Sequence, residues 1–184
     1  GPNALDLHYP GDTRQLADGE LFLIDIGATS SGHCADMSRT YPVSGRFTPR
    51  QLELYQLVLE GQKKAAGART GVDSVSDLDH LVRDFFRASP LRAKDSNGVE
   101  TTMDRFFVHS IGHYVGRQVH GADTGWNSYL PIEINQVFTL EPGLYIASEG
   151  IGIRIEDTYL VRTHALECLT CAAHKEPAEI QRLW

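Results

Sequence analysis

The sequence contains no run of basic residues, and its formal net charge is −7. Proteins that bind nucleic acid gather lysine and arginine against the phosphates, so this composition argues against a nucleic-acid partner. No apolar segment reaches the length needed to span a membrane, so no membrane partner is expected. No signal peptide is visible at the start, although the first residue here need not be the first residue of the gene product.

Cysteine is also scarce, with three residues, Cys34, Cys168 and Cys171. An odd number without a secretory signal predicts a reducing, cytoplasmic setting. Cys168 and Cys171 form a C-x-x-C pair. A zinc site would need two more ligands and only His174 is near, while a redox pair would need a thioredoxin-like βαβ context, which is missing. We therefore interpret the pair as two structural thiols near the last strand.

At 184 residues the chain is long enough for one domain with a sizeable core. Two helices are predicted. The first begins with Thr48 as N-cap, Pro49 at the first helical position and Gln51 closing a capping box. The second runs from about Asp73 to Ser89. Their apolar residues recur at helical spacing and are predicted to form core, namely Leu52, Tyr55, Val58 and Leu59, then Val75, Leu78, Leu81, Val82 and Phe85.

The stretch Leu21 to Tyr41 predicts a hairpin that carries an acid on each strand. The turn-forming residues centre it near Ser30 and Ser31, which sets Asp25 opposite Asp36 with Cβ atoms roughly 5 Å apart. Two carboxylates that close repel each other unless a proton or a cation lies between them. The alternative, in which one aspartate caps the turn and the other is solvated, stays open at this point.

The stretch Val137 to Leu160 repeats the arrangement around a turn at 148–150. Pairing centred near 148–149 sets Glu141 opposite Glu156, and Arg154 shares the face of Glu156 because it lies two residues before it. The chain is therefore predicted to make the same acid-bearing hairpin twice.

Between the hairpins, three histidines stand among glycines, where the backbone can approach a site closely: His109, His113 and His120. We predict strands around Phe106–His109 and Tyr114–Val119, a loop through Trp126, and a final helix at Pro177–Trp184. Four carboxylates and a histidine are the ligands that a pair of divalent ions such as Mn²⁺ or Co²⁺ would take.

Six segments follow one another along the chain: LHY at Leu7–Tyr9, LIDIG at Leu23–Gly27, ADMSRTYPVSGRFT at Ala35–Thr48, HSIGHYVGRQVH at His109–His120, TLEPGLYI at Thr139–Ile146 and IGIRIED at Ile151–Asp157. In this order they resemble the motifs of the pita-bread metallopeptidases, and within them the Xaa-Pro aminopeptidase (aminopeptidase P) and prolidase branch. One such motif would be weak evidence, whereas six in order, with every expected ligand type present, are specific.

The resemblance implies an α+β pita-bread fold, in which a curved antiparallel sheet carries helices on its outer face. Members of the family have further sequence before LHY, including the first half of the two-part catalytic fold and usually an N-terminal domain. We therefore expect residues 1–184 to form the C-terminal portion of a catalytic metallopeptidase domain. Members commonly form dimers or tetramers, so we expect a homo-oligomer or association with the N-terminal part.

The resemblance also implies a set of metal ligands. Asp25 matches a carboxylate that chelates one metal, and Asp36 and Glu156 match the two bridging carboxylates. His113 and Glu141 match the ligands of the other metal. Two divalent ions are implied, with Mn²⁺ as the family expectation, and Co²⁺ or Zn²⁺ could occupy the same ligands.

Further residues match catalytic positions of the family. Glu141 matches the group that shuttles a proton to the leaving amine. His109 and His120 match histidines that contact the substrate and stabilise the tetrahedral intermediate. His8 matches a histidine beside the substrate cleft. Arg154 matches an arginine beside the metals, and charge balance for the acids is the alternative reading of it.

The implied reaction is hydrolysis of the N-terminal Xaa-Pro bond of a peptide with proline at its second position. A prolidase, which takes only Xaa-Pro dipeptides, is the alternative within the branch. Methionine aminopeptidase fits less well because Arg39, the IRIE segment and the LHY histidine resemble the proline-directed branch. A creatine-hydrolysing relative does not need the full ligand set. Pita-bread modules that bind proteins or histones generally lose the ligands, which makes a non-catalytic module the alternative from another class.

Overall fold

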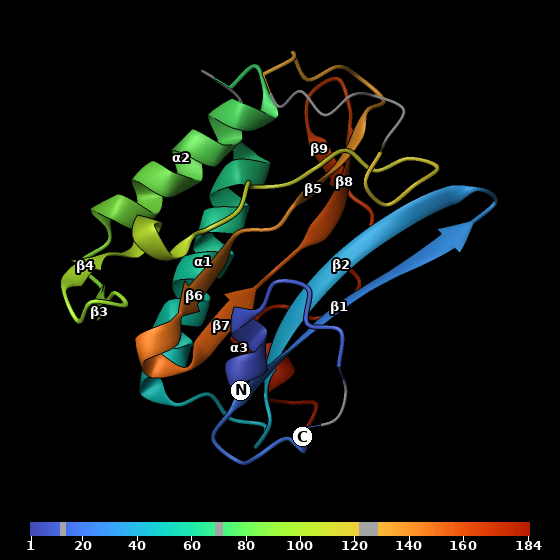
Figure 1. Ribbon diagram of the computed structural model, residues 1–184. Coiled ribbons are helices and arrows are strands. Elements are labelled where there is room, and N and C mark those ends of the chain that lie inside the picture. Colours follow the sequence, from blue (N-terminus) through green and yellow to red (C-terminus); the bar gives the residue numbers. More distant parts are fainter. Residues whose placement is uncertain (12–13, 69–71, 122–128) are drawn as a thin grey trace.

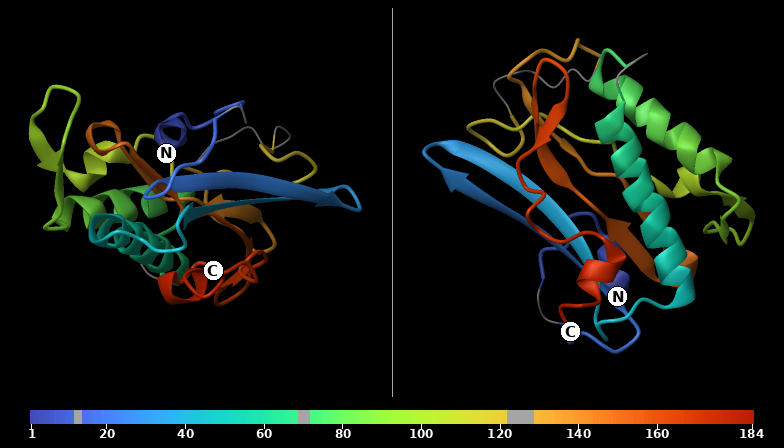
Figure 2. Two further views of the ribbon diagram at one scale, coloured as in Figure 1. Left: turned by 90° about the horizontal axis from the view of Figure 1, so that it is seen from below. Right: turned by 180° about the vertical axis from the view of Figure 1, so that it is seen from behind.

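The computed structural model describes residues 1–11, 14–68, 72–121 and 129–184. Helices and antiparallel strands are mixed along the chain, as the α+β prediction requires. Helices α1 (Pro49–Gly67) and α2 (Val75–Ala88) lie side by side against one face of the central strands, and the long hairpin of β1 (Leu21–Ser30) and β2 (His33–Pro42) extends away from them (Figures 1 and 2).

The register of the β1–β2 hairpin differs from the prediction by two residues. Asp25 pairs with Ser38, and Asp36 pairs with Gly27. The turn is formed by Ser31 and Gly32, both with positive φ (50° and 78°), rather than by Ser30 and Ser31. Because a slip of two residues leaves every side chain on its own face, Asp25 and Asp36 still share a face as diagonal neighbours.

The second acid-bearing hairpin has the predicted register but is interrupted midway. Strands β5 (Val137–Leu140) and β8 (Asp157–Val161) form its open end, and β6 (Gly143–Ile146) and β7 (Ile151–Arg154) form its closed end. The pairs Leu140–Asp157 and Gly143–Arg154 belong to one continuous register. Glu141 and Glu156 therefore lie at the break between the two ladders, where their amides donate instead to the carbonyls of Ile111 and Ser38.

Helix α1 supports this break from behind. Its N-terminus carries the predicted capping box between Thr48 and Gln51, and it buries Leu54, Tyr55, Val58 and Leu59. Gln62 of α1, fully buried, donates to the backbone carbonyls of Leu140 (3.0 Å) and Ile155 (3.2 Å). The carbonyls at these two positions of the break therefore have hydrogen-bond partners. A buried carbonyl without a partner would destabilise the fold.

The helical core was predicted with small errors. Leu52, Leu81 and Phe85 are only half-buried, because the buried faces run instead through Leu54 and Phe86. The second helix is capped by Ser74 and Asp77 and ends at Ala88, within two residues of its predicted bounds.

Two predicted strands around Phe106–His109 and Tyr114–Val119 are wrong. Phe106 ends a 3₁₀ turn, η2 (Met103–Phe106), and the histidine stretch is irregular apart from a single bridge between Tyr114 and Phe138. Its backbone instead runs alongside β5, where the amide of Thr139 donates to the carbonyl of His113 at 2.8 Å. The loop predicted through Trp126 lies outside the described residues.

The remaining elements are short. The chain opens with η1 (Pro2–Leu5), and a hairpin of β3 (Arg92–Lys94) and β4 (Glu100–Thr102) follows α2. After η4 (Ala147–Glu149) and the second hairpin come β9 (Leu166–Cys168), which pairs with β8, and α3 (Pro177–Ile180). The predicted C-terminal helix is thus correct in place but ends four residues early. No helix of the described part of the chain is long and apolar enough to cross a membrane.

The prediction for Cys168 and Cys171 was also wrong. They were interpreted as two thiols, but the structure joins them in a disulfide across their three-residue separation. Cys34, in β2, is the free cysteine.

Candidate active site

A single cleft of about 510 Å³ gathers all the predicted site residues. They come from five separate segments of the chain, namely the N-terminal loop, the β1–β2 hairpin, the histidine stretch and both strands of the second hairpin. The residues that line the cleft include His8, Asp25, Asp36, His109, His113, His120, Glu141, Arg154 and Glu156. The structure therefore brings these nine residues to one cleft, and their roles stay predictions.

His113 is the point on which three carboxylates converge. Its Nε2 lies 3.5 Å from Asp36 Oδ2, 3.6 Å from Glu141 Oε1 and 4.0 Å from Glu156 Oε1. The preceding residue, Gly112, makes this position possible: a Cβ at Gly112 would lie 1.9 Å from the carbonyl oxygen of Thr139. The backbone of the histidine stretch therefore approaches β5 more closely than any side chain would allow.

Hydroxyl side chains hold the acids in place, and two of them, Thr139 and Thr158, were not singled out from the sequence. Ser38 donates to Glu156 Oε2 at 2.7 Å. Thr158 contacts the backbone of Asp36 on both sides, accepting from its amide (3.0 Å) and donating to its carbonyl (2.7 Å). Thr139 accepts from the amide of His113 at 3.0 Å.

A signal for these hydroxyls was present in the sequence. Ser38, Thr139 and Thr158 each lie two positions from a cleft acid, which is the spacing of residues on one face of a strand. The two strands contact each other in both directions: Ser38, beside Asp36, donates to the Glu156 carboxylate, and Thr158, beside Glu156, bonds to the backbone of Asp36. The first contact orients an acid, and the second fixes the strand that carries the other acid.

Tyr145 is another residue that sequence reasoning missed. Its hydroxyl accepts a hydrogen bond from Arg154 Nη1 (2.9 Å) and lies 2.9 Å from His109 Nε2. His109 Nδ1 lies 2.8 Å from the carbonyl oxygen of Ser110. Since a carbonyl only accepts, Nδ1 carries the proton and Nε2 accepts from the tyrosine. Tyr145 therefore links the buried arginine to a cleft histidine.

Glu141 and Glu156 are poorly solvated, whereas Asp25 is partly exposed. Burial raises the pKa of Glu156 to about 9, and the neighbouring carboxylates of Glu141 and Asp36 add to the shift. Burial likewise raises the pKa of Glu141 to about 7, against the opposing charges of His113 and Arg154. For Asp25, burial raises the pKa by more than Arg154 lowers it. Carboxyls in this state gain from a neighbouring cation.

Asp36 and the two buried histidines behave differently. Burial works to raise the pKa of Asp36, but contacts with His113 and Asp25 outweigh it and hold that pKa below its usual value. Burial works to lower the pKa of His113, but Asp36 and Glu141 raise it overall. Burial lowers the pKa of His109 to about 4, so this ring is neutral at pH 7.

The donor set fits a divalent metal ion. Asp36, His113 and Glu156 each offer one ligand atom, and these atoms lie within 4.8 Å of one another. Among the described residues, one other cluster of this kind exists, Asp157 with Cys168 and Cys171, but its sulfurs are joined to each other. Oxygen and imidazole ligands suit Mn²⁺, Co²⁺ and Zn²⁺ alike.

Asp25 contacts Asp36 of this group and is also bound by Arg154. Its Oδ2 accepts a hydrogen bond from Arg154 Nη2 at 2.7 Å, and the Arg154 side chain is 4% exposed. A metal that used Asp25 would share its carboxylate with the arginine. His120 packs its ring edge-on against His113 at 4.6 Å between centroids, and both His120 and His8 are exposed at the rim of the cleft.

Comparison with known proteins agrees with this geometry. Residues 1–163 match metallopeptidase family M24. The chain belongs to that family. Over its whole length it is 35% identical to the Xaa-Pro aminopeptidase of Haemophilus influenzae, of which it covers 46%. The solved structure of an Escherichia coli aminopeptidase P variant matches all of the chain with a TM-score of 0.87 at 32% identity, and 45% of that chain is covered.

A prolidase structure from Pyrococcus furiosus is also similar, with a TM-score of 0.78 and 29% identity over 95% of this M24 chain and 48% of the prolidase. The predicted family and the pita-bread fold are thereby confirmed. The chain spans about half the length of these relatives, which agrees with the expectation of a partial fold. Membership of a metallopeptidase family implies divalent metal ions as cofactor.

Proposed function

We propose that the protein hydrolyses the N-terminal Xaa-Pro bond of peptides with two divalent metal ions held by Asp25, Asp36, His113, Glu141 and Glu156. The observation that carries the proposal is the convergence of Asp36, Glu141 and Glu156 on His113, within 4.0 Å of its Nε2. Three carboxylates around one imidazole, in a cleft with few balancing charges, are a costly arrangement unless cations occupy it.

Asp36 and Glu156 would be shared by the two ions, as the resemblance implies, and one ligand atom of each lies with one of His113 in a group no wider than 4.8 Å. When bound, the ions supply an acidified water and polarise the scissile carbonyl. Glu141 would move a proton from the attacking water to the leaving amine, the role implied by the resemblance. Arg154 holds Asp25 and, through Ser38, helps to orient Glu156.

The histidines at the cleft are proposed to act on the substrate. His120 and His8 are exposed at the rim, where a peptide would enter. His109 would stabilise the developing oxyanion with a ring N–H. Its Nε2 accepts from Tyr145 in the structure, so this role requires that the Nδ1 proton turn toward the substrate or that the tautomer change.

The identity of the metal, the substrate, the extent of the domain and its association with other chains are also proposals. Mn²⁺ is the preferred metal and a peptide with proline second is the preferred substrate. Residues 1–184 would form the C-terminal portion of the catalytic domain. Association with an N-terminal part or a second copy is favoured by β1, which exposes Ile26 (53%). The cytoplasmic setting stays a prediction.

Two alternative functions would give different experimental results. A prolidase would cleave Xaa-Pro dipeptides and leave longer peptides intact, and the similarity to the Pyrococcus furiosus prolidase keeps it in view. A non-catalytic binding module would keep its function when Asp36 or Glu156 is replaced.

Metal content and hydrolysis of the purified full-length protein test the proposal directly. We expect about two metals per chain, with Mn²⁺-dependent cleavage of an Xaa-Pro-Yaa tripeptide and weaker cleavage of Xaa-Ala-Yaa. The Asp36→Asn and Glu156→Gln variants should lose metal and more than 100-fold in kcat/KM. Cleavage restricted to the Xaa-Pro dipeptide would assign a prolidase. A folded protein with neither metal nor cleavage would refute the enzyme reading.

A further inference from the structure

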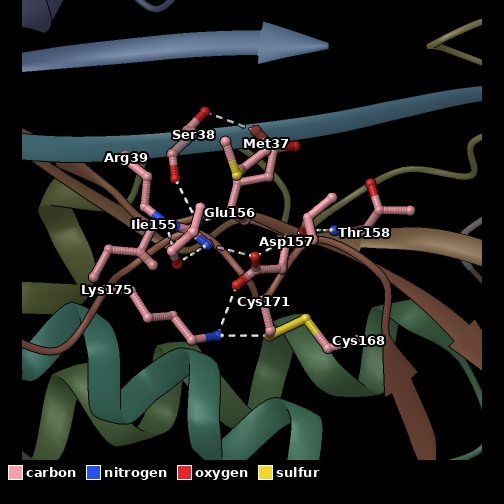
Figure 3. A network of polar contacts seen from close by, with 12 residues as sticks. Met37, Ser38, Arg39, Ile155, Glu156, Asp157, Thr158, Cys168, Cys171 and Lys175 are labelled. Atoms are coloured by element: carbon pink, nitrogen blue, oxygen red, sulfur yellow. Dashed lines mark hydrogen bonds and ion pairs between the residues drawn. A yellow bond between two sulfur atoms is a disulfide. The ribbon is translucent and has the colours of Figure 1, made fainter. Parts of the chain in front are cut away.

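The disulfide lies at the edge of a buried ionic network that ends at Glu156 (Figure 3). Lys175 Nζ lies 3.3 Å from Cys171 Sγ and 2.7 Å from Asp157 Oδ2. Asp157 in turn accepts from Arg39 Nη2 at 2.6 Å. A second nitrogen of the same guanidinium, Nη1, donates to the backbone carbonyl of Glu156 at 2.6 Å. Three side chains, those of Lys175, Asp157 and Arg39, thus connect a sulfur atom to the backbone of a proposed metal ligand.

The segment Cys168–Lys175, here called the cysteine loop, supplies further contacts to this network. Thr170 of the loop donates to Asp157 Oδ1 at 2.8 Å and accepts from the amide of Thr158 at 3.0 Å. The carbonyl of Ala173 accepts from Arg39 Nη2 at 3.1 Å. Arg39 and Asp157 therefore depend on the cysteine loop for a large part of their hydrogen bonding.

Burial makes this dependence strong. The side chains of Arg39 and Asp157 are 2% and 0% exposed. When a buried ion pair loses a partner, the charge left behind is unpaired and poorly solvated, which costs free energy. Water could not replace the contacts of a rearranged loop here, so Arg39 and Asp157 would have to move with it. The residues that precede these two in the chain, Ser38 and Glu156, support or line the cleft.

The disulfide is accessible to a reductant in solution. Cys171 is exposed and Cys168 half-exposed. A thiolate that attacks Cys168 Sγ breaks the S–S bond, and the bonding pair leaves on Cys171 next to the Lys175 ammonium, which stabilises that negative charge. A second thiol of the reductant then releases Cys168. Overall the disulfide takes up two electrons and two protons, and a dithiol reductant becomes a disulfide.

We propose that Cys168 and Cys171 form a redox-responsive site whose disulfide fixes the cysteine loop, and through Lys175, Asp157 and Arg39 holds Glu156 in position. Reduction by a dithiol loosens the loop and weakens metal binding in the cleft. The effect on the metal rests on the proposed function, whereas the loosening does not. Disulfides in a reducing compartment are usually of this reversible kind.

The test uses the full-length protein in a Cys34→Ser background, and alkylation followed by peptide mapping assigns the titrated thiols to Cys168 and Cys171. The metal-free protein is held with oxidised or reduced dithiothreitol, free thiols are counted, and amide hydrogen exchange is followed by mass spectrometry. We expect two thiols to appear in the folded, reduced protein. Exchange at Glu156 and Thr158 should quicken at least fivefold, while α2 stays unchanged. The Cys168→Ser/Cys171→Ser variant should match the reduced form and ignore dithiothreitol.

Mn²⁺ titration of the two states then gives the functional consequence, an expected three- to tenfold weaker affinity in the reduced state. A disulfide that resists the dithiol until the protein unfolds would overturn the proposal. Unchanged exchange after reduction, or an equal rise in α2, would also overturn it, because the bond would then have no local action on Glu156. Faster exchange with no Mn²⁺ binding in either state would keep the redox site and refute the proposed function. Mn²⁺ binding of equal strength in both states would refute the coupling to the metal.

Discussion

Arg154 and Asp25 form an ion pair of 2.7 Å across the cleft, although 129 residues separate them in the sequence. The arginine is almost fully buried, and it also donates to Ser38 (2.9 Å) and Tyr145 (2.9 Å). All three of its donor nitrogens therefore have partners from three different strands. It supplies fixed positive charge among carboxylates, whether or not metals are bound.

Replacing this guanidinium should destabilise the metal-free protein. Arg154→Met keeps most of the volume but removes the charge. It deprives Asp25 of its ion pair and removes one hydrogen bond each from the Ser38 and Tyr145 hydroxyls. We expect a loss of about 3 kcal/mol in the free energy of unfolding, measured by urea denaturation with a chelator present. Asp25→Asn is the matched control and should cost less, because the Asp25 side chain is 40% exposed. A loss below about 1 kcal/mol for the arginine variant would mean that the pair is dispensable.

The buried acid Glu156 should make stability depend on pH. Its pKa is about 9 in the folded protein, against an ordinary value of 4.5. Between these values the folded state keeps a proton that the unfolded state has lost, so the free energy of unfolding falls as pH rises. This contribution is complete below about pH 4.5 and is lost as the pH passes through about 9.

Glu156→Gln isolates the effect, because the amide keeps the shape and cannot titrate. The difference in unfolding free energy between the wild type and this variant, both metal-free, should shift against the wild type from pH 5 to pH 9. In saturating Mn²⁺ the wild type should instead gain stability with pH, since ligands must lose protons to bind metal. Parallel pH curves for the two metal-free proteins would contradict the raised pKa.

The sequence indicated which residues share the cleft more completely than it indicated the strand pairing around them. The β1–β2 register was two residues off because the turn uses Ser31 and Gly32 with positive φ, the geometry of a primed two-residue loop, for which Gly32 was the available signal. The error left the acids on one face because side chains alternate with a period of two. Face assignments are therefore more robust than pairings.

The two strands predicted in the histidine stretch were wrong for a different reason. The histidine stretch has strand-like composition, but its backbone groups bond to β5 from a distance of about 25 residues, as in the pair His113–Thr139. Contacts of that kind, like the approach of Tyr145 to His109, depend on three-dimensional packing that no local pattern encodes. The pairing of Cys168 with Cys171 had the right spacing, yet spacing alone does not fix the oxidation state.

Arg83 of α2 is predicted to secure the start of the histidine stretch. Its guanidinium donates to the carbonyls of Phe107 (2.7 Å) and His109 (2.6 Å), and it pairs with Asp79 at 2.5 Å. A lysine is a point donor that cannot serve both carbonyls and the carboxylate together. Arg83→Lys should therefore lower the free energy of unfolding by about 1–2 kcal/mol in thermal or urea unfolding.

Arg87, one turn further along α2, is the matched control for Arg83. Its side chain is 56% exposed and pairs with Asp84, which is 72% exposed, and with Asp104, which is 10% exposed. Arg87→Lys should change stability by less than about 0.5 kcal/mol. Equal effects at the two positions would show that the carbonyl contacts of Arg83 contribute nothing beyond a surface ion pair.

Gly112 and Gly116 provide a direct test of how the histidine stretch reaches the acids. A Cβ at Gly112 would lie 1.9 Å from the carbonyl oxygen of Thr139, whereas a Cβ at Gly116 would meet no atom within 4 Å. Gly112→Ala must therefore push the stretch away from β5 and strain the backbone hydrogen bond between Thr139 and His113. We expect it to cost about 2–4 kcal/mol of stability.

Metal affinity separates this displacement from simple destabilisation. In Gly112→Ala the imidazole of His113 would withdraw from Asp36, so Mn²⁺ affinity should fall at least tenfold under conditions where the variant is still folded. Gly116→Ala should bind Mn²⁺ as the wild type does and unfold within about 0.5 kcal/mol of it. If Gly112→Ala lost stability but kept its affinity, the acids would hold the metal without His113, and the imidazole at the centre of the cluster would not be a ligand.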